Sequence, residues 1–328
     1  MRLIENPKTY NGRELETIFF RPMFVGPNAE QLGIRMMYNM PVPTTVQVWS
    51  PRHDVLRAYT SGWEGGKSAQ RLQKHIELTK VKAEVGFSAS DYFQQVYELI
   101  VGSADVNLDD LTGTELEKAE TELFRAAIAE SLRVMMWMGD TSADIFNEFD
   151  GLLVRLYKYT QDGEEIPAFN CLNIPITPDN ILDILGGMWK AASPELKALK
   201  SEGNLAFFVT TDIYDAYEQY LDQCGADGAY TDLMSGRREL SYHGIKLIDM
   251  GISQYMPLHY NRRSTHCILT DRRNLILAVN TADYPGSEVR MWYNPDEMEN
   301  RQRATFMVGT EILDETLLVY GQFNPTTL

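Results

Sequence analysis

The pattern of apolar and polar residues is most regular between Thr114 and Met138, where apolar positions recur at helical spacing. The predicted apolar face consists of Leu116, Ala119, Leu123, Ala127, Val134 and Met138, and glutamates occupy most of the opposite face. Thr114 and Glu117 have the spacing of a capping box, and Gly139 is a typical helix stop. We therefore predict an amphipathic helix about 37 Å long, at roughly 1.5 Å per residue, packed on a sheet.

Residues 1 to about 35 follow neither the helical nor the strand period, and Pro7, Pro22 and Pro27 interrupt them. This predicts an extended arm. Its large apolar residues are Ile18, Phe19, Phe20, Met23 and Phe24. A free tail with such residues would be sticky, so the arm is expected to lie on its own body or on another subunit.

The segment 41–85 has the alternation of a β-hairpin, with a Gly-rich turn at 61–66. The return strand places Ile76 and Leu78 on one face and then Val81, Ala83 and Val85 on the other. The phase changes near Lys80, which predicts a bulge or a change of environment. A two-stranded hairpin alone is marginally stable. Its aromatic residues Trp49, Tyr59 and Trp63 are expected either to contact a neighbour or to pack in the domain's own core.

The flanks of the long helix contain two further predicted helices. Ser88–Gly102 has an apolar side and a candidate N-cap at Ser90, and 139–153 is interpreted as a turn, a short helix and a turn. A Pro-punctuated linker from Pro167 to Pro178 predicts a domain boundary.

The second half of the chain predicts an α/β layer followed by strands. Thr177 is a candidate cap of a helix that has Pro178 at its first position and a buried stripe of Ile181, Leu185, Met188 and Trp189. A buried strand is predicted at 204–210, a helix at 213–224, and mostly strands from Leu240 onward.

Composition excludes several classes of function. The 328 residues include 30 basic and 46 acidic side chains, a net charge of −16, which argues against a dedicated nucleic-acid or anionic-membrane binder, although a local basic patch is compatible with this total. Cys171, Cys224 and Cys267 are too far apart for a disulfide framework or a Cys-x-x-Cys metal site, so a reducing cytoplasm is expected. The N-terminus lacks a signal-peptide pattern, and no apolar run has membrane-spanning length.

The sequence SGWEGGKS at 61–68 resembles a phosphate-binding loop, but Ser61 replaces the first glycine. A nucleotide site here would use Lys67 and a magnesium carboxylate such as Asp249, whose strand is interrupted by Lys246. The alternative is a flexible hairpin tip.

Histidines and cysteines suggest no metal centre. His266 and Cys267 are adjacent, and neighbouring strand residues point to opposite faces, so we predict structural roles for them and for His259. The common hydrolase, metalloprotease and dinucleotide-binding motifs are absent from the sequence. We therefore predict no enzyme activity, catalytic residue, cofactor or metal.

The order of these parts resembles the major capsid proteins of tailed bacteriophages, the Hong Kong 97 fold. Residues 71–93 resemble the return strand of that family's extended loop. Residues 115–140 resemble its spine helix with a Gly-Asp end, and FDGLL at 149–153 resembles the Gly-Leu-Leu that follows. Residues 176–189 and 204–221 resemble the axial domain, and ILTDRRNLILAVN and MENRQRATFMVGTEIL resemble the late strands.

The resemblance implies an α+β fold with an arm (1–40), an extended β-hairpin loop (41–85), a peripheral domain with the spine helix (86–166 and 281–328) and an α/β axial domain (167–280). It implies a structural protein that self-assembles, as hexamers and pentamers, into the icosahedral head shell around the DNA of a tailed phage or prophage. The expected subunit-interface residues are Phe19, Phe20, Phe24, Trp49, Tyr59 and Trp63.

The same resemblance implies separate scaffolding, portal and decoration proteins as partners, packaged DNA held without specific binding, and no membrane. The protein would be assembled in the host bacterial cytoplasm and would reside in the virion. The alternatives are an encapsulin-like compartment of the same fold, another phage structural subunit of the tail or connector, and a P-loop nucleotide hydrolase using Lys67.

Overall fold

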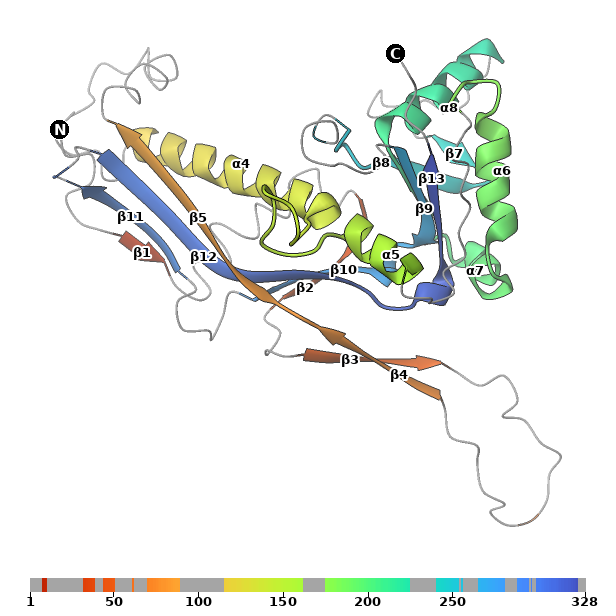
Figure 1. Cartoon of the computed structure of the whole chain (residues 1–328), viewed down its shortest axis with the longest axis horizontal. Helices are drawn as coiled ribbons and strands as arrows, with labels where there is room; N and C mark the ends of the chain where they lie inside the picture. Colours follow the sequence, from red (N-terminus) through yellow and green to blue (C-terminus); the bar gives the residue numbers. More distant parts are fainter. Residues whose placement is uncertain are drawn as a thin grey trace.

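A computed structural model of the chain describes two mixed sheets, their helices and a separate hairpin (Figure 1). The residues described are 8–10, 32–38, 44–50, 61, 70–88, 115–161, 175–224, 240–253, 255, 265–280, 288–294, 296 and 299–323. The helix predicted at Ser88–Gly102 lies outside these residues.

The longer sheet is organised around β12 (Glu299–Ile312), which pairs antiparallel with three strands. These are β5 (Thr79–Ser88), β10 (Leu275–Asn280) and β11 (Glu288–Asn294). Two short strands from the N-terminal region complete the sheet: β1 (Lys8–Tyr10) pairs with β11, and β2 (Arg35–Tyr38) pairs in parallel with β10. Part of the predicted arm therefore lies on the chain's own sheet.

Helix α4 (Glu115–Met138) packs across this sheet and confirms the long helix predicted from the sequence. Its buried stripe includes Phe124, Ile128, Leu132 and Met135, which share a core with Ala304, Phe306 and Val308 of β12. Val134 and Met138 are buried as predicted, but Ala127 is exposed. The prediction was wrong there because the next residue, the larger Ile128, and Phe124, one turn before it, turn toward the sheet instead.

The corner after α4 is built on two glycines. The Gly151 N–H donates to the Gly139 carbonyl over 2.7 Å, and a Cβ on Gly139 would come within 2.3 Å of the Phe149 carbonyl oxygen. Residues 139–150 are turns and bends, so the short helix predicted there was wrong. The helix begins later, as α5 (Leu152–Gln161), and its first five residues are mostly buried.

The five-stranded sheet has the order β13–β9–β6–β8–β7. Its strands are β6 (Leu205–Val209), β7 (Ser241–Tyr242), β8 (Ile245–Asp249), β9 (Thr265–Asp271) and β13 (Leu318–Phe323), and only β6 and β8 are parallel. Its helices are α6 (Ile181–Ala191), α7 (Pro194–Ala198), α8 (Thr211–Gln223) and the 3-10 turns η2 (Leu199–Glu202), η4 (Arg272–Asn274) and η5 (Glu315–Leu317).

Helices α6 and α8 cover one face of this sheet, and the end of α4 covers the other. Figure 1 shows α6 and α8 on the far side of the sheet from α4. On the α4 side, the Trp137 and Phe208 rings lie 5.7 Å apart, so the C-terminal turn of α4 joins the two sheets through one continuous core.

Two details of the second half differ from the sequence predictions. Helix α6 begins at Ile181 with Asn180 as its N-cap residue, so the predicted cap at Thr177 was wrong. The Asn180 side chain instead accepts from the Thr177 N–H and donates to the Pro175 carbonyl, which stabilises a turn before the helix. The expected strand at 204–210 and helix at 213–224 are confirmed as β6 and α8.

The strand pairing also crosses the predicted domain division. Strand β10, within 167–280, belongs to the longer sheet, whereas β13, within 281–328, belongs to the five-stranded sheet. The connection that contains η4 passes the chain from one sheet to the other in three residues, and the connection that contains η5 does so in five, Leu313–Leu317. Such short turns leave no change of composition that would mark a boundary in the sequence.

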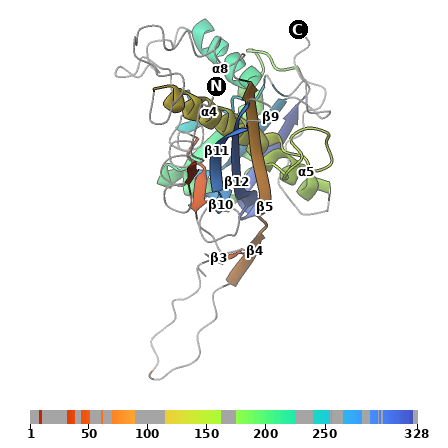
Figure 2. The ribbon, with the colours of Figure 1, turned by 90° about the vertical axis from the view of Figure 1, so that its left-hand side faces the viewer.

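The hairpin of β3 (Thr44–Ser50) and β4 (Gln70–Ile76) forms a sheet of its own. Figures 1 and 2 show it projecting away from the two sheets as the continuation of β5. The connection between β4 and β5 is only Glu77 and Leu78, so on this side the hairpin is attached to the body at a narrow root.

Candidate functional site

The hairpin root is defined by a change of strand partner. Strand β4 pairs with β3 up to Ile76, and β5 pairs with β12 from the Thr79–Val308 pair onward. The next β12 residue, Gly309, faces the connector so closely that a Cβ would lie 2.1 Å from the Glu77 carbonyl oxygen. Glycine here lets the two backbones cross. The predicted phase change near Lys80 is confirmed as this change of environment.

An apolar contact anchors the root to the longer sheet. Ile76, which is 1% exposed, packs against Ile276 and Ala278 of β10. Half-buried residues complete this cluster: Met37, Val46, Leu78 and Leu313. The alternate residues of β10 face the α4 core, so β10 is buried on both faces, by α4 on one side and by the hairpin root on the other.

Lys74 forms the polar contact of the root. Its ammonium forms an ion pair with Glu315 on η5 and lies 4.6 Å from the centre of the Tyr159 ring on α5. Burial alone would lower the pKa of Lys74, but the hydrogen bond to Glu315 and the negative charges of Glu315 and Glu311 outweigh it and raise the pKa. Lys74 is therefore a firmly charged group that connects β4 with α5 and η5.

Glu311 is the buried carboxylate behind Lys74, with a side chain only 4% exposed. It accepts hydrogen bonds from Arg155 Nη1 at 3.0 Å, Tyr159 Oη at 2.7 Å and the Ile312 backbone N–H at 3.1 Å. Burial and the Glu311 charge raise the pKa of Tyr159 to about 12, so the phenol remains a donor. The three donors compensate for the cost of burying the carboxylate.

The turn that carries Glu315 is braced by Asn274. The Asn274 backbone carbonyl accepts from the Leu313 N–H, its side-chain oxygen accepts from the Asp314 N–H at 2.9 Å, and its side-chain nitrogen donates to the Asp314 carbonyl at 2.8 Å. Asp314 in turn accepts from the Thr316 N–H. Glu315 therefore sits on a fixed turn at the junction between the two sheets.

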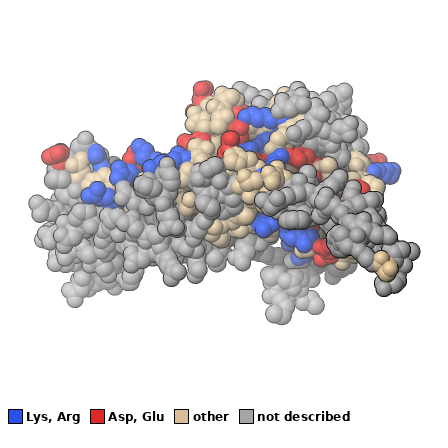
Figure 3. Space-filling view, turned by 90° about the horizontal axis from the view of Figure 1, so that it is seen from below, with Lys and Arg blue, Asp and Glu red and all other residues tan. Residues whose placement is uncertain are grey.

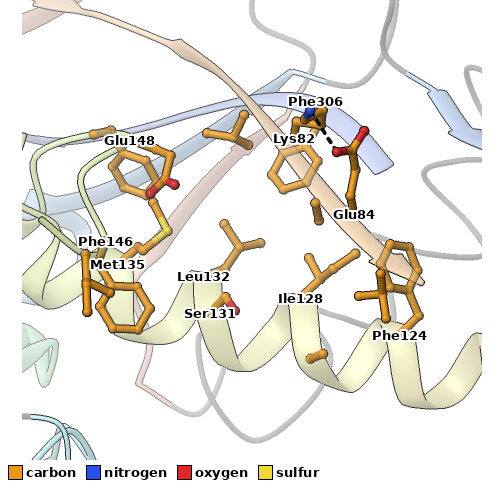
Figure 4. Close-up of a pocket in the computed structure, with 16 residues that line it drawn as sticks. Lys82, Glu84, Phe124, Ile128, Ser131, Leu132, Met135, Phe146, Glu148 and Phe306 are labelled. Carbon is orange, nitrogen blue, oxygen red and sulfur yellow. Dashed lines mark ion pairs between the residues drawn. The ribbon is translucent and has the colours of Figure 1, made fainter. Parts of the chain in front are cut away.

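A groove of about 380 Å³ runs between α4 and β5 (Figure 4). Its α4 wall is Phe124, Ile128, Leu132 and Met135, and an ion pair between Lys82 and Glu84 lies on the β5 side. Ile145, which also lines the groove, is 52% exposed. The groove is thus mainly apolar, with charges restricted to its rim.

The interface residues predicted from the sequence fall almost entirely outside the described part of the chain. Phe19, Phe20, Phe24, Tyr59 and Trp63 are not described, and Trp49 is placed only by its backbone, opposite Arg71 in the hairpin ladder. Their interface roles therefore stay predictions.

The nucleotide-site hypothesis also stays a prediction, because Lys67 lies outside the described residues. Its expected carboxylate, Asp249, ends β8 and accepts hydrogen bonds from Thr211 Oγ1 and the Gly251 N–H. These contacts give Asp249 a structural role at the end of the strand.

His266 and Cys267 are buried on opposite faces of β9. His266 Nδ1 lies 3.0 Å from Tyr320 Oη, which also accepts from Gln322 at 3.0 Å, and Cys267 packs among apolar residues. Burial raises the pKa of the Cys267 thiol. Among the described residues, no group of His, Cys, Asp and Glu is arranged to hold a metal ion.

Sequence reasoning missed Lys74, Tyr159, Glu311 and Glu315, because they come from three distant segments. The available signal was Gly309, a glycine in the interior of an otherwise apolar strand, which often marks a close backbone approach.

Basic side chains lie over the longer sheet of this acidic chain. Figure 3 shows Lys and Arg side chains over the left-hand part of the molecule, where Figure 1 places the longer sheet, and side chains of both charges over the rest of this face. The guanidinium groups of Arg290 and Arg303 each lie 5.7 Å from the Trp292 ring centre. No helix in the described part of the chain is both long and apolar enough to cross a membrane.

Neither protein-family models nor curated protein sequences match this chain. Solved structures, in contrast, do match this chain. A chain of the satellite phage P4 procapsid, a structure including the size determination (Sid) protein, aligns with a TM-score of 0.56 at 8% identity, covering 93% of this chain and 98% of that one. A chain of the capsid of an empty GTA particle aligns with a TM-score of 0.50 at 16% identity, covering 90% and 96%. This likeness confirms the capsid-type fold that the sequence resemblance predicts.

Proposed function

We propose that this chain is the major capsid protein of a tailed phage or prophage, and that its copies assemble into the icosahedral shell enclosing the DNA. The fold likeness, which covers 93% of this chain and 98% of a P4 procapsid chain, carries the proposal. The projecting hairpin supports it, because an isolated two-stranded hairpin is marginally stable and gains stability by packing on another surface. Contacts from one copy to a different surface on the next generate repeating assemblies, which form rings when the rotation between copies closes.

Within this proposal, the subunits form hexamers and pentamers, and Phe19, Phe20, Phe24, Trp49, Tyr59 and Trp63 bury their side chains between copies. Scaffolding, portal and decoration proteins are separate chains, and the DNA inside is held without specific binding. The proposal assigns the protein to the virion after assembly in the bacterial cytoplasm, and it assigns no catalytic role to any residue.

Electron microscopy of the purified full-length chain tests the assembly. Negative-stain images are expected to show shells, or capsomers where scaffolding is missing, and light scattering should give a mass many times the 37.4 kDa of one chain. A monomer at every concentration, including after addition of the proteins encoded beside it, would contradict the proposal. Nuclease-resistant DNA inside particles would support a phage shell, whereas protein cargo would favour the encapsulin-like alternative.

Substitution of the hairpin aromatics tests the interface separately. Trp63→Ala is expected to reduce the yield of particles while leaving the melting temperature of the unassembled subunit unchanged. A fall in subunit stability with normal assembly would instead place Trp63 in the chain's own core.

A further inference from the structure

The hairpin of β3 and β4 is held at its base by side chains and by two covalent connections: residues 39–43, which lead from β2 into β3, and Glu77–Leu78, which lead from β4 into β5. Its two strands form hydrogen-bonded ladders only with each other among the described strands. The connector Glu77–Leu78 crosses Gly309, where no side chain stands between the two backbones. On the β4 side, the two-residue connector is therefore a narrow point about which the direction of the hairpin can change.

The two contacts at this base differ in kind. The apolar contact of Ile76 with Ile276 and Ala278 lies immediately beside the connector, and such contacts have no fixed direction. Lys74 lies two residues farther along β4, and its ion pair with Glu315 fixes one point of the hairpin to one point of the body. Of these two contacts, the ion pair is therefore the one that sets a direction.

The body side of that ion pair is rigid and lies at the junction of the two sheets. Asn274 braces the turn before Glu315, and η5 connects β12 of the longer sheet to β13 of the five-stranded sheet. Tyr159 and Glu311 fix the other side of the Lys74 ammonium, through the ring of Tyr159 and the negative charge of Glu311.

We infer that the Lys74–Glu315 ion pair is a releasable latch that sets the direction of the hairpin relative to the junction between the two sheets. When the pair is broken, the hairpin pivots at Glu77–Leu78 while Ile76 keeps its base on the sheet. The two side chains are only 23% and 21% exposed, so the pair is partly shielded from water and salt but remains accessible to a competing charge. The inference concerns a single chain and does not depend on shell assembly.

Pulsed electron paramagnetic resonance on a doubly labelled full-length chain tests this. Spin labels replace Gln73 on β4 and Ala126 on α4, both exposed, in a chain carrying Cys171→Ser and Cys224→Ser; Cys267 is buried and stays. Neighbouring strand residues point to opposite faces, so a label at Gln73 points away from Lys74. Dilution with unlabelled chain ensures that each assembly contains isolated labelled copies.

The parent chain is expected to give one narrow distance distribution. Lys74→Met and Glu315→Gln should each roughly double its width, a change typical of a segment that samples several directions. Lys74→Arg, which keeps the positive charge, should remain near the parent. Lys82→Met is the matched control, because Lys82 forms an exposed ion pair with Glu84 within β5, at 2.8 Å.

A broad distribution in the parent, or unchanged widths in both latch variants, would overturn the inference. Equal broadening in Lys82→Met would also overturn it, since the loosening would then be general. If Lys74→Met fails to fold, Glu315→Gln tests the latch from its other side. A chain that never assembles would refute the proposed shell function without affecting this measurement.

Discussion

A Cβ atom at Gly309 would lie 2.1 Å from the carbonyl oxygen of Glu77, a separation below the 3.0 Å that real Cβ atoms respect. The only way to place a side chain there is to push the hairpin connector away from β12. The crossing of these two backbones is therefore a requirement of the fold, and it places the hairpin at this point of the sheet.

Gly309→Ala is expected to destabilise the subunit by about 1–3 kcal/mol, the usual cost of overpacking. Chemical denaturation of the unassembled chain measures this. Gly186→Ala is the control, because the added Cβ would meet only the flexible Tyr242 hydroxyl at 3.2 Å, within helix α6. Equal stability of Gly309→Ala and the parent would show that the connector moves freely.

Glu311→Ala should cost on the order of 3 kcal/mol, because it leaves the Arg155 guanidinium without its carboxylate in a largely buried site. The free energy of unfolding measures this loss. The double variant Arg155→Met with Glu311→Met should recover part of it, since no uncompensated charge remains. Glu148→Gln, an exposed substitution, provides the baseline. A neutral Glu311→Ala would contradict the role of Glu311 as the centre of this cluster.

The rotation of α4 about its axis is directly testable. Ile128→Ala should cost about 2–5 kcal/mol because Ile128 is 5% exposed in the core between α4 and the sheet. Ala127→Gln should change stability by less than about 0.5 kcal/mol, since Ala127 is exposed. Thermal unfolding of the two variants decides between this orientation and the one that the sequence pattern predicts, in which the order of the two effects is reversed.

Asp150 makes the corner between α4 and α5 sensitive to acid. Burial would raise the pKa of Asp150, but hydrogen bonds from Lys158 and from the Thr141 N–H and hydroxyl outweigh it and hold the pKa below its ordinary value of 3.8. Its contribution to stability is therefore present above pH 3.8 and is lost as the pH falls through the lower pKa of the folded state.

The melting temperature of Asp150→Asn should accordingly fall less than that of the parent between about pH 5 and pH 2. At neutral pH the variant should be less stable, because the asparagine cannot pair with Lys158. If the melting temperatures of Asp150→Asn and the parent fall by the same amount over this pH range, this carboxylate is ruled out as a source of the acid sensitivity.

Local sequence patterns predicted the elements whose stability depends on neighbours in the chain. The bounds of α4 were predicted within one residue, because capping and the stop at Gly139 act within a few residues. Strand β6 and helix α8 were predicted for the same reason, from a continuous apolar run and a 3.6-residue period. The short helix between 139 and 150 was wrong, because two backbone segments meet there at Gly139 and Gly151 and need a tight corner.

By itself, the sequence determined the long helix, the hairpin that changes environment near Lys80, and the capsid-type order of parts, since each leaves a periodic or ordered trace along the chain. Only the tertiary structure decided which face of α4 is buried, which sheet receives β10 and β13, and that Lys74, Tyr159, Glu311 and Glu315 meet at the hairpin root. Those outcomes depend on contacts between residues up to 241 positions apart, and such contacts are set by packing and charge pairing across the fold rather than by any local pattern.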